Sequence, residues 1–263
     1  MCVYAKEDPL FLAQCIESVL AQAVLPEQWV IVKDGPLTDG LEQVLSELRF
    51  PNELKVVALP ENVTLGPARA EGLLAASYDW VAIMDSDDIC RPDRFIKQCA
   101  MIENDPSLCL VGGQIMEFRE DPGNTAKSRL VPCGHDEIVS FLKKRNPFNH
   151  VTMMLRRDLA LEAGNYVYFP WFEDYDLWSR MICNGARCAN HPDVLVDVRV
   201  GDDTYGRRRG LSYIRSEWRM QKQLRKLGLI GAGGFIRNIA ARIPVRLLPG
   251  RILAMIYRKY ARK

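Results

Sequence analysis

The first 120 residues alternate short apolar runs with amphipathic segments of helical period, and this alternation restricts the possible folds more than any other feature. Such alternation is typical of βαβ units, in which a helix packs on the sheet between two parallel strands. The first helical segment begins with Asp8 as N-cap and Pro9 in the first position. We therefore predict an α/β fold with a Rossmann-like, mostly parallel central sheet flanked by helices.

The same patterns give approximate boundaries for each element. The expected strands are 1–4, 29–32, 54–59, 80–84, 108–118, 150–155 and 194–200, and the expected helices are 9–23, 38–48, 66–77, 92–103, 136–144, 158–163 and 173–183. Residues 121–133, rich in Gly, Pro, Asn and Ser, are expected to form a loop. A first strand of about four residues is short, which leaves open a start upstream of Met1.

The composition is that of a globular protein. With 263 residues, 48% of them hydrophobic and 26% charged, the chain is long enough for one large domain, or for a domain with an appendage. It contains no run of 18 uncharged apolar residues and begins with neither a basic n-region nor an apolar h-region. We therefore expect no spanning helix and no signal peptide, and a chain that stays in the cytosol.

Eight cysteines are scattered along the chain without a Cys-x-x-Cys pair. Several stand in apolar strand or helix patterns, where a reduced thiol packs as a small hydrophobic group. We expect reduced core residues rather than disulfides or a metal site.

Charge is distributed very unevenly along the chain. Residues 206–263 hold 16 of the 35 Lys and Arg residues and a single acid, Glu217, so this tail carries +15 and the preceding part carries −13. We predict two domains, 1–205 and 206–263, of which the second is a helical basic extension. Such asymmetry indicates a polyanionic partner, either a membrane leaflet or a nucleic acid.

The end of the tail favours the membrane. Arg251, Arg258 and Arg262 fall on one side of a helix, opposite apolar residues, as in helices that lie on an anionic membrane surface. The alternative is a helix that packs on the protein body with a solvated basic face. No nucleic-acid-binding module accompanies the charge, so we expect no nucleic acid partner.

Acidic residues follow two of the predicted strands. Asp34 follows one strand, and Asp85 and Asp87 follow another, at the edge where open α/β sheets bind ligands. Two residues apart in extended chain, Asp85 and Asp87 point the same way. Carboxylate oxygens suit Mg²⁺ or Mn²⁺ that bridges to phosphates. The alternative is a solvated acidic turn that caps the next helix.

A second acidic cluster, Glu173-Asp174-x-Asp176, begins a predicted helix. Carboxylates at that position also cap a helix and oppose its dipole, which is the simpler explanation. The aromatic run just before the cluster favours a second explanation, in which one of these carboxylates is a general base. An apolar surface beneath a carboxyl group raises its pKa, as such a base requires.

Six fragments, in this order, together resemble a family 2 glycosyltransferase with the GT-A fold, of the bacterial surface-polysaccharide type. They are Val3-Tyr4, Ser18 to Gln22, Lys33-Asp34-Gly35-Pro36, Glu61 to Arg69, Met84 to Asp88 with Arg91 to Phe95, and Phe172 to Trp178. The resemblance covers about residues 1–200. It implies an inverting, metal-dependent enzyme that transfers a sugar from a nucleotide-sugar.

The resemblance also implies roles for individual residues. On the donor side, Asp34 would bind the base, which Tyr4 flanks, and Arg69 would approach the nucleotide. In the acidic turn, Asp85 would contact the ribose, Asp87 would hold Mn²⁺ or Mg²⁺, and Ser86 would also bind the donor.

On the acceptor side, the resemblance makes Asp174 the general base that deprotonates the attacking hydroxyl, with Glu173 as its neighbour. We expect acceptor contacts from His150, whose strand runs beneath the acceptor site in this family, and from Trp171. For His150 and for His191, a hydrogen-bonded structural role is the alternative to ligand binding.

The chain departs from the family pattern in two places. Ala5 stands where the family has Asn, and no Gln-x-x-Arg-Trp motif is present, which argues against a processive polysaccharide synthase. The Arg207-Arg208-Arg209 run is either a solvated face or a contact to the donor diphosphate or an acceptor phosphate. No Gly-x-Gly-x-x-Gly follows an early strand, so a Rossmann dehydrogenase is excluded.

Together these observations predict a non-processive glycosyltransferase with a UDP-sugar as donor and a lipid-linked saccharide as acceptor. Its place would be peripheral, at the cytoplasmic face of the inner membrane, in the synthesis of O-antigen, capsule or exopolysaccharide. The alternatives are an inactive membrane-associated scaffold with the same fold and a metal-dependent nucleotidyltransferase.

Overall fold

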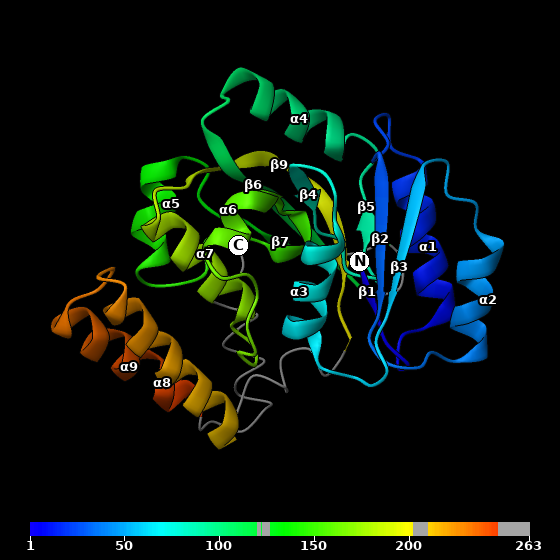
Figure 1. Ribbon diagram of the computed structural model, residues 1–263. Helices are drawn as coiled ribbons and strands as arrows, with labels where there is room; N and C mark the ends of the chain where they lie inside the picture. Colours follow the sequence, from blue (N-terminus) through cyan, green and yellow to red (C-terminus); the bar gives the residue numbers. More distant parts are fainter. Residues whose placement is uncertain (120–121, 123–126, 202–209, 247–263) are drawn as a thin grey trace.

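The structure, a computed structural model, describes residues 1–119, 122, 127–201 and 210–246 of the chain. In these residues two sheets lie side by side with helices around them (Figure 1). The predicted α/β fold is confirmed. No helix among the described residues is long and apolar enough to cross a membrane.

The first sheet is entirely parallel. It contains β1 (Cys2–Val3), β2 (Gln28–Lys33) and β3 (Glu53–Ala58) in the order β1-β2-β3. Two helices, α1 (Pro9–Leu20) and α2 (Asp39–Glu47), connect these strands, while α3 (Leu65–Ala75) leads on to the second sheet. Asp8 caps α1 as predicted, because its carboxylate accepts a hydrogen bond from the Leu10 backbone at 2.8 Å.

Alternating residues of β2 explain why helices cover both faces of this sheet. Ile31 is buried in one core cluster with α1 and α2. The adjacent Val32 points the other way, toward Gly72 of α3, where an added Cβ would lie 3.1 Å from the valine methyl group. A strand buried on both faces reads as a continuous apolar run, which is the pattern that predicted it.

The second sheet is mixed. Its strands are β4 (Trp80–Ala82), β5 (Ile89–Cys90), β6 (Leu108–Phe118), β7 (Lys127–Arg129), β8 (Met154–Arg156) and β9 (Arg187–Arg199), in the order β4-β8-β6-β9-β5 with β7 paired to β6. The long β6 and β9 are parallel, as predicted for the central sheet. The other pairs are antiparallel.

Helices complete the body and follow it. They are α4 (Arg94–Asn104), α5 (His135–Leu142), the 3₁₀ turn η1 (His150–Thr152), α6 (Arg157–Glu162), α7 (Glu173–Cys183), α8 (Gly210–Lys226) and α9 (Ala232–Arg246). The last two pair with each other beside α7 (Figure 1). Tyr213, Met220 and Leu224 of α8 are buried in the same core cluster as Trp178 of α7, so the helical extension packs on the body.

Three predicted segments differ most from the structure. Residues 150–152 form η1 rather than strand, because the Thr152 hydroxyl binds the Asn149 carbonyl at 2.7 Å and accepts from the Gly113 backbone at 3.0 Å. Strand β9 begins at Arg187 rather than 194, since pairing with β6 extends it through a stretch without an apolar run. The predicted loop 121–133 contains β7, which adds to the edge of β6.

Two predictions fall on residues outside the described ranges: the terminal amphipathic helix at 251–262 and the Arg207-Arg208-Arg209 run. All eight cysteines carry free thiols, and Cys15, Cys90 and Cys188 are buried.

Candidate active site

One cleft of about 1480 Å³ collects most of the residues singled out in the sequence. It is lined by Tyr4, Asp34, Asp85, Ser86, Asp87, His150, Trp171 and Asp174. These residues follow β1, β2 and β4, stand in η1, or flank the start of α7. Arg69 and Glu173 do not line the cleft but lie directly behind it.

Asp34 is buried at the carboxyl end of β2, where it fixes the neighbouring loop. Its carboxylate accepts hydrogen bonds from the Val63 backbone at 2.7 Å and from the Asn62 side chain at 2.9 Å. Gly35 follows with a φ of 85°, and a Cβ there would lie 2.8 Å from the Asn62 nitrogen. Only glycine allows this approach without strain, so the Asp-Gly pair sets one rim of the cleft.

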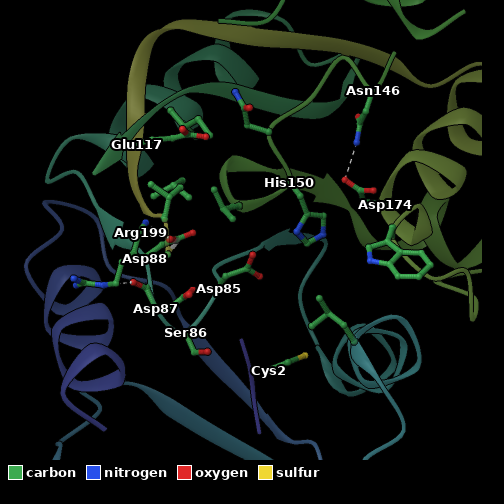
Figure 2. A pocket seen from close by; sticks show the side chains of 18 of the residues that line it. Cys2, Asp85, Ser86, Asp87, Asp88, Glu117, Asn146, His150, Asp174 and Arg199 are labelled. Carbon is green, nitrogen blue, oxygen red and sulfur yellow. Dashed lines mark hydrogen bonds between the residues drawn. The ribbon is translucent and has the colours of Figure 1, made fainter. Parts of the chain in front are cut away.

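The acidic turn at residues 85–88 leaves the sheet earlier than expected. Strand β4 ends at Ala82, so Asp85 and Asp87 do not share an extended chain, yet both line the cleft (Figure 2). Asp88 accepts a hydrogen bond from the backbone of Arg199 at 2.9 Å. The Arg199 side chain in turn donates to the Asp87 carbonyl at 3.1 Å. The end of β9 therefore holds the turn in place.

Arg199 was not predicted as a site residue. Its guanidinium lies 3.8 Å from the ring centre of Phe11 and 4.7 Å from that of Phe118, and it donates to Gln14 at 2.7 Å. A lone arginine at the end of a strand gives no signal in one sequence, because its partners lie 80 or more positions away.

Carboxyl groups crowd around the acidic turn. Burial, followed by the nearby charges of Asp87 and Asp85, raises the pKa of Glu7 to about 7. Burial and the same two charges raise the pKa of Asp88 well above its usual range. Glu7 was not predicted as a site residue, although it stands three positions after Tyr4.

The turn is chemically suited to a divalent cation. No group of three or more His, Cys, Asp or Glu residues with the geometry of a metal site occurs in the described part of the chain. Mg²⁺ and its relatives, however, are commonly bound by one or two carboxylates together with substrate phosphates. Crowded hard oxygen ligands at the edge of an open cleft fit that arrangement.

Arg69 joins the two acidic clusters. From α3 it donates to Asp85 at 2.7 Å and to Glu173 at 3.2 Å. Its side chain is 8% exposed, whereas the Asp85 side chain is 33% exposed, so the cation is shielded from water more than its partner. Burial alone would raise the pKa of Asp85, but the charge of Arg69 and its hydrogen bond to the carboxylate outweigh burial and leave that pKa lowered.

Asp174 lies on the other side of the cleft, at the start of α7 (Figure 2). Asn146 donates to one carboxylate oxygen at 2.7 Å, and the Tyr175 backbone donates to the other at 2.6 Å. Burial raises the pKa of Asp174 in spite of Arg69 and these hydrogen bonds. Burial and the charge of Asp174 raise the pKa of Glu173 to about 7. Asn146 was missed, because an Asn before a Pro reads as a turn.

His150 stands between the acidic turn and Asp174 (Figure 2). One ring nitrogen lies 3.1 Å from the Tyr166 hydroxyl. The ring also stacks on that of Trp178, with the two ring centres 6.0 Å apart. Burial, helped by the charge of Arg69, lowers the pKa of His150 to about 3, so the ring is neutral at pH 7. His191 lies on β9 and does not line the cleft.

Trp171 is 42% exposed at the rim of the cleft, on a backbone with a φ of 67°. Its ring centre lies 5.3 Å from that of Tyr213 on α8. The helical extension thus contributes to the cleft beside the start of α7.

Comparison with known proteins identifies the family. The profile of Glycosyl transferase family 2 matches residues 1–164. The chain is 42% identical over 263 residues to an uncharacterized glycosyltransferase of Haemophilus influenzae, with 100% of this chain and 98% of the relative covered. The chain belongs to glycosyl transferase family 2.

Two further relatives have more specific names. This family 2 glycosyltransferase is 38% identical to the amylovoran biosynthesis glycosyltransferase AmsE of Erwinia amylovora, with 98% of the chain and 96% of the relative covered. It is 33% identical to the Escherichia coli UDP-Gal:alpha-D-GlcNAc-diphosphoundecaprenol beta-1,3-galactosyltransferase, with 100% and 95% covered.

Solved structures confirm the GT-A fold. S. aureus TarS in complex with UDP-GlcNAc aligns with a TM-score of 0.69 at 16% identity, covering 93% of this chain and 71% of that one. A mannosyltransferase from Pyrobaculum calidifontis, in complex with GDP-Man and Mn²⁺, aligns with a TM-score of 0.63 at 16% identity, covering 98% and 74%.

We predict that Arg69→Leu destabilises the enzyme by about 2 kcal/mol at pH 8, because two partly buried carboxylates lose their shared cation. The loss will be smaller at pH 5, where burial lets the unpaired carboxyl groups take up protons. In the wild type the lowered pKa of Asp85 contributes stability that is present above the ordinary carboxyl range and is lost only as the pH falls through the lowered value.

Urea unfolding of both proteins at pH 5 and pH 8 measures this difference. Arg157→Leu is the matched control, because Arg157 donates to the carbonyls of Leu73 and Leu74 rather than to an acid. An equal loss at the two pH values for Arg69→Leu would contradict the electrostatic explanation.

Proposed function

We propose that this family 2 glycosyltransferase transfers a sugar from a UDP-sugar to a lipid-linked saccharide during the synthesis of a surface polysaccharide. One observation carries the proposal: a single cleft holds the acidic turn at Asp87 and, on its other side, Asp174 with a raised pKa. The names of the relatives that act in amylovoran biosynthesis and on a diphosphoundecaprenol acceptor support the donor and acceptor classes.

On the donor side we assign the base to Asp34 and Tyr4, and the ribose and diphosphate to the turn at Asp85, Ser86 and Asp87. Arg69 is a positioning residue, since it holds Asp85 rather than lining the cleft. Asp87, with Glu7 beside it, would hold a divalent cation, Mn²⁺ or Mg²⁺, that supplies charge neutralisation for the departing diphosphate.

On the acceptor side Asp174 is the general base. Its Oδ takes the proton of the acceptor hydroxyl, the hydroxyl oxygen bonds to the anomeric carbon, and the bond from that carbon to the diphosphate oxygen breaks. Attack from the face opposite the leaving group inverts the configuration. Asn146 and the Tyr175 backbone fix the carboxylate. We assign the neighbouring Glu173 to orient the acceptor or tune the base.

His150 and Trp171 serve the acceptor in this proposal. A neutral imidazole between the two acidic groups offers a hydrogen bond to a sugar without adding charge. Trp171 presents an exposed aromatic face at the rim, which suits packing against a sugar ring.

The donor site is tested by calorimetric titration of UDP in Mn²⁺ and in EDTA. We expect UDP to bind at least about tenfold more tightly with Mn²⁺, and Asp87→Asn to remove this difference, because one carboxylate links the cation to the protein. Asp79→Asn, which changes an exposed acid just before β4, is the matched control. Tighter binding of GDP than of UDP would contradict the proposed donor.

The general base is tested by transfer kinetics. We predict that Asp174→Asn lowers kcat by about 10²-fold to 10⁴-fold with little change in UDP affinity, since proton transfer alone is lost. Wild-type kcat/KM should fall as the pH drops through a raised carboxyl pKa, because only the ionised base accepts a proton. Asp136→Asn, an exposed acid in the first turn of α5, is the control. Full activity of Asp174→Asn would exclude this role.

We further propose that the extension predicted at residues 206–263 rests peripherally on an anionic membrane at its cytoplasmic face. On α8 and α9, the side chains of Trp218 and Ile236 are 41% and 66% exposed. Lys222 lies 5.8 Å from the centre of the Trp218 ring, and Phe235 of α9 meets the same ring edge-to-face, with ring centres 5.1 Å apart. Exposed apolar groups beside cations suit the boundary between headgroups and acyl chains.

Sedimentation with vesicles that contain anionic lipid tests this contact. Ile236→Ser should weaken binding several-fold, because one exposed apolar side chain no longer inserts. Val56→Ser is the matched control, since Val56 is 45% exposed on β3, away from the extension. Equal binding to neutral and anionic vesicles, or an equal effect of both substitutions, would contradict the proposal.

A further inference from the structure

Four arginines line the cleft on the side of Asp174. They are Arg129 of β7, Arg145 after α5, and Arg242 and Arg246 of α9. We call this group the arginine wall. None of the four was predicted as a site residue. They come from three separate parts of the chain.

The segment between α5 and η1 brings the arginine wall together. Arg242 donates to the Lys144 carbonyl, and Asn238 one turn earlier on α9 donates to the Lys143 carbonyl at 2.9 Å. Arg145 follows directly in the chain. The next residue is Asn146. Its side chain donates to Asp174, and its backbone carbonyl accepts from Arg129 at 3.3 Å. The arginine wall is therefore anchored to the segment that holds Asp174.

A buried acid positions the two arginines of α9. Glu217 of α8 has no exposed surface, and its carboxylate accepts from Arg242 at 2.7 Å and lies 4.0 Å from Arg246. The Arg246 guanidinium also lies 4.6 Å from the centre of the Tyr213 ring. One carboxylate is thus shared by two cations at this end of the cleft, where the low exposure of these groups strengthens their interaction.

The two sides of the cleft therefore differ in charge. Around the acidic turn, the negative charges of Asp85 and Asp87 would repel an anion that arrives without a cation. The arginine wall attracts an anion directly, and arginine forks match the paired oxygens of a phosphate. A reaction whose donor and acceptor both carry a diphosphate needs two diphosphate sites. One would bind through a cation held by acids, and the other through arginines.

We infer that the arginine wall binds the diphosphate of a saccharide-diphospholipid acceptor and so places the sugar hydroxyl at Asp174. This inference rests on the proposed function. It also explains the place of the helical extension: α9 contributes two arginines to the cleft, while Ile236 on the same helix is exposed where a lipid chain could enter the membrane.

The test compares two acceptors that carry the same saccharide, one on a lipid diphosphate and one on an uncharged alkyl group. Arg145→Gln should raise the KM for the diphosphate acceptor about tenfold and leave the KM for the alkyl acceptor within twofold, because only the former offers charged oxygens. Arg246→Gln is the second variant. Arg225→Gln, which removes the same charge from an exposed position on α8, should change neither KM.

The donor also carries a diphosphate, so the affinity for UDP in Mn²⁺ is measured on the same variants. An unchanged affinity assigns the arginine wall to the acceptor. A tenfold loss of UDP affinity would overturn the inference, as would an equal loss of activity on both acceptors or no loss on either.

A binding experiment separates this inference from the proposed function. Inorganic pyrophosphate is titrated in EDTA, where the donor site lacks its cation. We expect Arg145→Gln and Arg246→Gln to weaken this binding at least fivefold and Asp87→Asn to leave it unchanged. If transfer fails with every acceptor but pyrophosphate binding depends on the arginines, the proposed function fails and the anion site stands. If transfer proceeds and no arginine variant affects binding or KM, the inference alone fails.

Discussion

The two halves of the site depend on one buried cation. Arg69 ion-pairs with Asp85, which follows β4, and with Glu173, which begins α7, so α3 ties the acidic turn to the helix that carries Asp174. Without this guanidinium, three carboxyl groups from distant parts of the chain would face each other in a poorly solvated space. Shared by two acids, the charge instead holds them together, while burial keeps the pKa of Asp174 raised in spite of Arg69. The family resemblance assigns Arg69 to the nucleotide, whereas in the fold its guanidinium contacts these two acids.

The chemistry of the cleft follows from its uneven charge. Crowded carboxylates on one side suit a dication and the leaving diphosphate, whereas arginines on the other side suit an anion without a metal. Asp174 lies toward the basic side, held by Asn146. The helical extension is part of this arrangement, since Arg242 and Arg246 of α9 line the cleft and Glu217 of α8 orients them. Packing on the body, which was the alternative to membrane contact, therefore occurs for α8 and α9 and is compatible with a membrane-facing surface on the same helices.

Prediction from the sequence succeeded where local pattern and burial coincide. The apolar run of β2, the Asp8-Pro9 start of α1 and the acidic start of α7 were each correct to within a few residues. Prediction failed where hydrogen bonding to a neighbouring strand, rather than the local hydrophobic pattern, determines the backbone conformation. Residues 187–193 form strand because β6 lies beside them, and η1 replaces a strand because buried Asn149 and Thr152 bind the backbone of β6. Glu7, Asn146 and Arg199 were missed for a similar reason: a short polar side chain beside a turn, or a lone arginine, has no periodicity to reveal it.

The sequence by itself determined the α/β class, the family and half of the acids that line the cleft, because strand ends and helix starts are local properties and parallel strands bring their carboxyl ends to one edge. Only the tertiary structure decided which charges face each other. It paired Arg69 with Asp85 and Glu173, gave Asp87 the neighbour Glu7, and brought arginines from β7, from the segment after α5 and from α9 to one wall. Electrostatic interactions act between positions far apart in the chain, and their sign and strength depend on burial and distance, which a linear pattern does not contain.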